Sequence, residues 1–118
     1  MVLTIGVLGG GAWGSTLAGL LAEAGHHVQI WRRCQGSEGL QALEGVELLV
    51  GATALVGVKG IAEEMRSWAP RPLLSCSKGL DPASGKTASA LWSLSCPQWP
   101  LVVLSGPNLA SELQQGLP

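Results

Sequence analysis

A glycine-rich turn between an apolar strand and an apolar-striped helix constrains this chain most. Residues 9–14 are Gly-Gly-Gly-Ala-Trp-Gly, which contains the pattern G-x-G-x-x-G at a strand-to-helix junction. In such a turn Gly9 permits the tight bend, Gly11 lets the backbone approach a pyrophosphate, and Gly14 lets the helix pack closely on the strand. The N–H groups of residues 12–15 and the helix dipole would then face phosphates. The segment predicts a dinucleotide site, and the competing interpretation is a glycine-rich turn without a ligand.

Predicted strands and helices alternate along the whole chain. The apolar pattern predicts strands over residues 3–8, 27–31, 47–50, 72–76 and 101–104. Helices are predicted over residues 12–24, 53–68, 84–94 and 108–115, with at most one short helix between 34 and 45. In the first helix an apolar stripe is expected to lie on the sheet, formed by Leu17, Leu20, Leu21 and Ala24. This alternation predicts an α/β fold of Rossmann type with a doubly wound, mainly parallel sheet.

The composition indicates one packed domain. The chain has 118 residues, of which 47% are hydrophobic and 13% charged, so residues 1–118 are expected to form a single dinucleotide-binding domain. A formal net charge of -1 without a basic run argues against nucleic acid and acidic membranes as partners. No targeting or membrane segment is recognisable, and we expect a cytoplasmic protein. No metal site is expected, and reduced thiols are expected at Cys34, Cys76 and Cys96.

Two arginines follow the second predicted strand and bear on which cofactor the turn would bind. Domains that bind NAD usually carry Asp or Glu at this point to hold the ribose 2′-hydroxyl. Arg32 and Arg33 stand here instead, and guanidinium groups suit the 2′-phosphate of NADP through bidentate hydrogen bonds. The sequence therefore predicts NADP as the preferred cofactor, with NAD as the second choice. The competing interpretation is a pair of solvated arginines at a strand end.

Three segments, in order, resemble one enzyme family. They are VLGGGAWGSTLAGLLAEAGHHVQIWRR at residues 7–33, SKGL at 77–80 and SGPNLASEL at 105–113. Together they resemble the N-terminal domain of the bacterial glycerol-3-phosphate dehydrogenases that use NAD or NADP, over nearly the whole chain. Other β-hydroxyacid and sugar-nucleotide dehydrogenases share the glycine turn but not the Ser-Gly-Pro-Asn run.

The resemblance implies an activity and a set of site residues. The implied reaction is the NAD(P)H-dependent reduction of dihydroxyacetone phosphate to sn-glycerol 3-phosphate for glycerophospholipid synthesis, with this chain supplying the cofactor-binding half. Beside Gly9, Gly11 and Gly14 of the turn, the implied cofactor contacts are Trp13, Arg32, Arg33, Lys78 and Ala110. The implied substrate contacts are Lys78, Gly106 and Asn108.

The positions of Lys78 and of the last segment agree with these roles. Lys78 follows the fourth predicted strand and Gly106 the fifth, so both fall at carboxyl ends of parallel strands, where open α/β sheets bind ligands. An ammonium group there can polarise a carbonyl or neutralise a phosphate. The Asn108 amide can bond a substrate hydroxyl or cap a following helix. The plainer interpretation of Lys78 is a solvated loop lysine.

Two departures from the family limit what is expected of this chain. The link after Arg33 is shorter than in most members, which predicts a compact variant of the domain. Members continue into a C-terminal helical domain with the general-acid lysine and the dimer contacts, and this sequence ends at Pro118 before it. We therefore assign no catalytic residue, expect weak or no activity from this chain alone, and expect a homodimer only of full-length members. The alternative is a non-catalytic dinucleotide-binding module or a degenerate remnant.

The remaining ionisable side chains are interpreted as structural or solvated. His26 and His27 follow the helix-ending Gly25, in a turn far from the expected site. The carboxylates on predicted helix faces are expected to be solvated and to form no acid–base pair, and they belong to Glu23, Glu63, Glu64 and Glu112.

Overall fold

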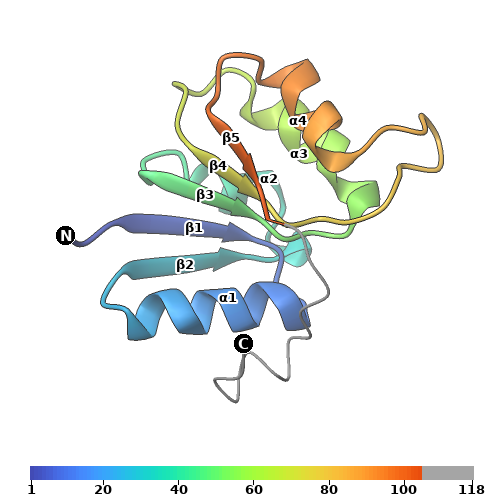
Figure 1. Ribbon diagram of the computed structural model, residues 1–118. Helices are drawn as coiled ribbons and strands as arrows, with labels where there is room; N and C mark the ends of the chain where they lie inside the picture. The colour runs from blue at the N-terminus through green and yellow to red at the C-terminus, as the bar shows by residue number, and fades with distance from the viewer. Residues whose placement is uncertain (105–118) are drawn as a thin grey trace.

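A computed structural model of the protein describes residues 1–104, which form a five-stranded parallel sheet with helices on both faces (Figure 1). The strands are β1 (Thr4–Leu8), β2 (His27–Trp31), β3 (Leu48–Gly51), β4 (Leu73–Ser75) and β5 (Leu101–Val103). The helices are α1 (Ala12–Glu23), α2 (Gly36–Gln41), α3 (Val58–Met65) and α4 (Ala88–Ser95), with 3-10 turns at Arg33–Gln35 and Leu55–Gly57. The predicted doubly wound Rossmann-type fold is confirmed, while the helix predicted over 108–115 lies outside the described residues.

The strand order is β2-β1-β3-β4-β5, so the chain changes its direction of travel across the sheet after β2. β1 pairs in parallel with β2 on one edge and with β3 on the other. The connection from β2 to β3 passes over β1 through the short α2, as the brevity of this link predicted. In sheets wound this way, a crevice opens between the two strands where the winding reverses, which here are β1 and β3.

Two apolar clusters form the core, one on each face of the sheet. α1 lies on one face, while α3 and α4 pack together on the other (Figure 1). The larger cluster lies on the α3–α4 side and includes Leu8, Leu49, Met65 and Trp92, each at most 1% exposed. Strands buried on both faces need nearly continuous apolar sequence, which explains the unbroken runs in β1 and β3. Within residues 1–104, no helix combines the length and apolar character that crossing a bilayer requires.

The stripe predicted for α1 is wrong in part. Leu17 and Leu21 are half-buried against the sheet, but Leu20 is 39% exposed and Ala24 is exposed beyond the helix end. The helix instead turns its small residues inward, with Gly14 and Ala18 buried. A helix whose first turn packs directly on the strand end has its rotation fixed there, and that rotation carries Leu20 outward.

Two other helices begin later than predicted. The predicted start of the third helix, residues 53–57, ends in the 3-10 turn Leu55–Gly57 before α3, and residues 84–87 form a tight loop before α4. In this loop the Asp81 carboxylate accepts hydrogen bonds from Ser84 N and Ser84 Oγ at 3.1 and 2.7 Å. Thr87 then caps α4, since its Oγ1 accepts from Ala90 N at 3.3 Å. Asp, Ser and Thr side chains bond nearby backbone N–H groups that a helix would otherwise use, and so they determine the residue at which the helix begins.

Side chains also fasten the start of β1. His26 Nδ1 accepts from Leu3 N at 3.0 Å, and Glu47 Oε1 accepts from Thr4 N at 3.0 Å. These bonds satisfy the backbone N–H groups of Leu3 and Thr4, where the hydrogen bonds between strands begin. The interpretation of His26 as a structural residue agrees with this contact.

Arg71 ties together three chain segments at the amino ends of the strands. Its guanidinium lies 5.2 Å from the Trp68 ring centroid and 5.6 Å from that of Trp99. It donates to the carbonyls of Glu44 and Val46 before β3, and to Ala69 O at 3.0 and 3.1 Å. Burial lowers the pKa of Arg71, and the charge of Glu44 partly offsets this by raising it.

We expect Arg71→Lys to lower the free energy of unfolding by about 1–2 kcal/mol. A lysine keeps the charge but loses the planar fork and its stacking between two indoles. Urea denaturation followed by circular dichroism measures the change. Arg66→Lys is the matched control, because Arg66 is exposed at the end of α3, and it should leave the midpoint unchanged. Equal midpoints for all three proteins would contradict the role of Arg71.

Candidate functional site

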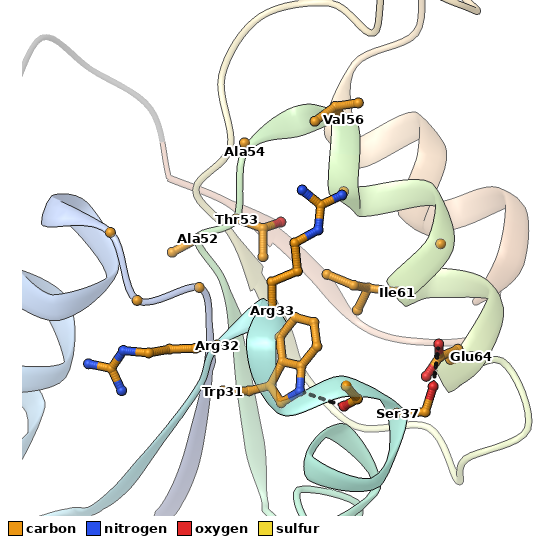
Figure 2. A pocket seen from close by; sticks show the side chains of 16 residues that line it. Trp31, Arg32, Arg33, Ser37, Ala52, Thr53, Ala54, Val56, Ile61 and Glu64 are labelled. Carbon is orange, nitrogen blue, oxygen red and sulfur yellow. Dashed lines mark hydrogen bonds between the residues drawn. The ribbon is translucent and has the colours of Figure 1, made fainter.

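A pocket of about 600 Å³ opens at the carboxyl ends of β1 and β3, where the winding of the sheet reverses. Three segments supply most of its walls: the glycine turn after β1, the residues after β2, and the residues after β3 with the adjoining face of α3 (Figure 2). Among the predicted site residues, the pocket lining includes Gly9, Gly11, Arg32 and Arg33. The site therefore lies where the sheet topology alone would place a ligand.

The glycine turn is shaped by close backbone contacts on one side and open space on the other. Gly9 has φ +115°, and a Cβ at this residue would lie 2.8 Å from Ala52 O. A Cβ on Gly14 would overlap Gly9 O, so helix and turn touch backbone to backbone. A Cβ on Gly11 would meet nothing within 4 Å, although Gly11 lines the pocket. Gly9 and Gly14 are thus required by the fold, whereas Gly11 leaves room for a ligand.

The first turn of α1 has fewer available N–H groups than predicted. Ser15 N donates to Gly11 O at 2.9 Å, so the N–H group of residue 15 is already bonded within the helix. The N–H groups of residues 12–14 precede the first helical bond and can face an anion together with the helix dipole. The expected set of residues 12–15 is corrected to 12–14.

The two arginines after β2 point in different directions (Figure 2). Arg32 lies along the glycine turn, where a Cβ on Gly10 would be 2.6 Å from its Nε. Arg33 crosses the pocket toward Thr53 and Val56 on the opposite wall (Figure 2). Both side chains are exposed, and Arg32 N donates to Gln35 Oε1 at 2.6 Å, which fixes the backbone between them. The pair therefore offers two separate cationic positions rather than one cluster.

Thr53 provides a hydroxyl on the wall formed after β3. Its Oγ1 is buried and has no hydrogen-bond partner within residues 1–104. A buried hydroxyl without a partner is costly, and because protein atoms cover Oγ1, a pocket ligand reaches it only if the Thr53 side chain rotates. Ser77 Oγ donates to Thr53 O at 2.6 Å and so ties the loop after β4 to this wall. Lys78, the next residue, is exposed on that loop and is not part of the pocket lining.

Several lining residues were missed by the sequence analysis. Trp31, the last residue of β2, is 7% exposed and donates from Nε1 to Gly36 O at 2.9 Å. Ser37 Oγ donates to Glu64 Oε1 at 3.0 Å, which links α2 to α3 across the pocket. Glu64 is exposed on α3, as expected, and it also lines the pocket, which the sequence analysis did not include. The spacing from Gly57 through Gly60 to Glu64 was the available signal for this helix face.

Trp13 and Gly14 lie next to the pocket but outside its lining. The Trp13 ring is half-buried and joins the apolar cluster that contains Cys76. Burial raises the pKa of the Cys76 thiol, and the nearby indole N–H of Trp13 partly offsets this by lowering it. That N–H lacks a geometrically complete hydrogen bond among the described residues. Cys76 is therefore a core thiol, as predicted.

Some predicted residues cannot be placed in this site. Gly106, Asn108 and Ala110 lie outside the described residues. Across residues 1–104, no group of three or more His, Cys, Asp or Glu side chains is arranged to hold a metal ion. The described site thus combines the open side of the glycine turn, two arginines, the Glu64 carboxylate and a partly apolar pocket wall.

A family model and individual relatives among known proteins match this chain, and they agree on one enzyme family. The family model for the N-terminus of NAD-dependent glycerol-3-phosphate dehydrogenase matches residues 4–40 and 35–118. A glycerol-3-phosphate dehydrogenase (NAD(P)+) of Synechococcus sp. (strain RCC307) is 73% identical over 118 residues, which are 100% of this chain and 39% of that protein. The enzyme of the same name from Nostoc sp. (strain PCC 7120 / SAG 25.82 / UTEX 2576) is 42% identical over 98% of this chain and 38% of its own length. The chain thus spans about two-fifths of these relatives.

Solved structures agree with the sequence matches. The crystal structure of glycerol-3-phosphate dehydrogenase from Coxiella burnetii superposes with a TM-score of 0.82 at 25% identity, covering 98% of this chain and 44% of that one. The enzyme from Saccharomyces cerevisiae gives a TM-score of 0.75 at 17% identity, over 98% of this chain and 45% of that one, and supports the fold alone.

Proposed function

Because this chain belongs to the NAD-dependent glycerol-3-phosphate dehydrogenase family, matching its N-terminal domain, we propose that residues 1–118 are a dinucleotide-binding domain that takes NADP in preference to NAD. The observation that carries the proposal is the pocket between β1 and β3, which joins the glycine turn and Arg33 in one space. A dinucleotide needs both features, because its pyrophosphate and its adenosine end bind at separate positions.

The residues present fit such a cofactor. The open side of Gly11 and the N–H groups of residues 12–14 suit the pyrophosphate. Arg33, which crosses the pocket, suits a 2′-phosphate, and Arg32 lies along the turn where it can add positive charge beside the pyrophosphate. Thr53 lines the wall beside this position. No acidic side chain follows β2 directly, which supports NADP over NAD.

The proposed activity of the full protein is the reduction of dihydroxyacetone phosphate to sn-glycerol 3-phosphate in the cytoplasm, for glycerophospholipid synthesis. When bound, the cofactor supplies the hydride that reduces the ketone carbon. Lys78, which follows Ser77 on the loop tied to Thr53, is proposed to face the substrate and the nicotinamide side. Gly106 and Asn108 are proposed as further substrate contacts, and Trp13 and Ala110 as further cofactor contacts. We assign the general-acid role to no residue of this chain.

A titration of the purified 118-residue protein tests cofactor binding directly. We expect NADPH and NADH each to saturate the protein with a Kd below about 1 mM, NADPH binding more tightly. Trp31 lines the pocket, so its fluorescence should change on binding, and calorimetry gives an independent isotherm. Circular dichroism confirms that the sample is folded. A folded protein that binds neither nucleotide below millimolar concentration would refute the assignment.

A further inference from the structure

Helix α3 turns one face toward the pocket, and that face has an unusual composition. Gly60, Ile61 and Glu64 line the pocket, together with Gly57 immediately before the helix. Residues separated by three, four and seven positions share one side of a helix, so these four form a continuous wall. The wall lies across the pocket from the glycine turn, with Arg33 between them (Figure 2).

Gly60 has no structural reason to be glycine within the described protein. It lies inside α3, where glycine costs about 1 kcal/mol relative to alanine. A Cβ on Gly60 would meet nothing within 4 Å, so no neighbouring group requires its absence. The missing side chain instead keeps the pocket wall flat beside Ile61. A flat, partly apolar wall suits the face of a planar ring.

Glu64 lies at the end of this wall, and a hydrogen bond fixes the position of its carboxylate. Ser37 Oγ donates to Glu64 Oε1 at 3.0 Å and thereby orients the group from α2. A carboxylate has about four acceptor positions, so this bond leaves capacity for a further donor. Among the described residues that line the pocket, Glu64 is the single acidic one. A carboxylate beside a ring-sized wall selects a ring that presents an N–H donor at its edge.

We infer that the α3 wall is the platform for the adenine ring and that Glu64 accepts a hydrogen bond from its 6-amino group. The inference rests on the proposed function. If the pyrophosphate binds at the glycine turn and the 2′-phosphate at Arg33, the α3 wall is the part of the pocket that remains for the adenine ring. Adenine carries a donor at position 6, whereas hypoxanthine carries an acceptor oxygen there. The Glu64 carboxylate attracts a 6-amino group and repels a 6-oxo oxygen, so it favours adenine over hypoxanthine when position 6, rather than the neighbouring N1, lies against it.

Paired titrations with NADPH and reduced nicotinamide hypoxanthine dinucleotide phosphate test the inference. The two ligands have the same phosphates, so the ratio of their Kd values isolates the base. The unmodified protein should prefer NADPH by about tenfold, as expected for one partly solvated charge-assisted hydrogen bond. Glu64→Gln keeps the size of the side chain and can both donate and accept, so it should bring the ratio close to one. Glu63→Gln, the same change on the exposed neighbour outside the pocket, should keep it near tenfold.

Gly60→Ala tests the platform separately. The added methyl group should leave the free protein as stable or more stable, because it enters open space in a helix. It should weaken both dinucleotides several-fold and leave their ratio unchanged. Equal affinity of the unmodified protein for the two ligands, or an unchanged ratio in Glu64→Gln, overturns the inference while NADPH binding stands. Failure of the unmodified protein to bind either ligand overturns the proposed function itself.

Discussion

Gly14→Ala is expected to lower the free energy of unfolding by at least about 3 kcal/mol and to abolish nucleotide binding. A Cβ at this residue would overlap Gly9 O and lie 3.0 Å from Gly9 C, so it meets rigid backbone rather than a movable side chain. Relief requires α1 to move away from the end of β1, which disrupts the buried contacts of Ala18. Losses of this size are a large part of the stability of a small domain.

Gly19→Ala in the same helix is the matched control. Gly19 is exposed, and a Cβ there would meet nothing within 4 Å. The substitution should raise the free energy of unfolding by about 0.5–1 kcal/mol through helix propensity alone. Urea denaturation of both variants, with equal m-values as a check on two-state behaviour, measures the difference. Similar midpoints for Gly14→Ala and Gly19→Ala would refute the close packing of the turn against α1.

Replacing Arg32 and Arg33 together with alanine is expected to weaken NADPH binding about 100-fold and NADH binding only several-fold. The 2′-phosphate would lose charge-assisted hydrogen bonds, and NADH has no such group. Calorimetric titration of each nucleotide measures both effects. Arg66→Ala, which removes one exposed charge outside the pocket, controls for the general loss of positive field. Equal loss for NADPH and NADH would contradict the 2′-phosphate role.

Replacing Arg32 and Arg33 one at a time should separate the loss of NADPH preference from the general loss of nucleotide affinity. Arg33 crosses the pocket, so Arg33→Ala should account for most of the lost preference for NADPH. Arg32 lies along Gly10 in the glycine turn, so Arg32→Ala should weaken both nucleotides to a similar degree. If Arg32→Ala instead removed most of the preference for NADPH and Arg33→Ala weakened both nucleotides equally, the roles assigned to the two arginines would be exchanged.

Local pattern was enough to predict the strands, the glycine turn and the class of the fold. The turn needs φ > 0 at Gly9 and contact at Gly14, and glycine is the residue that permits both, so the sequence carries this information directly. The apolar runs of β1 and β3 likewise follow from burial on both faces of the sheet.

Features that depend on distant contacts were not predictable in this way. The rotation of α1, which leaves Leu20 exposed, is set where Gly14 meets Gly9, and the leucine pattern does not contain that contact. Glu64 has the sequence context of a solvated helical residue. The spacing from Gly57 through Gly60 to Glu64 marks one helix face, but the bond from Ser37 on another helix could not be predicted from it. The delayed start of α4 is a different case: it follows from the local bonds of Asp81 with Ser84, which the apolar pattern used to predict the helix does not contain.

The position of β1 between β2 and β3 also bears on the order in which the chain can assemble during translation. Ile5 pairs with Val28 on one edge and with Leu48 on the other, so the first strand to leave the ribosome waits for a much later partner. Such long-range parallel pairing is slow, and until it forms, one edge of β1 is open to other chains or to chaperones. The glycine turn also gains its opposite wall only once Ala52 and Thr53 have been made. A nascent chain halted before β3 should therefore be protease-sensitive and unable to retain nucleotide, although it already contains the whole glycine motif.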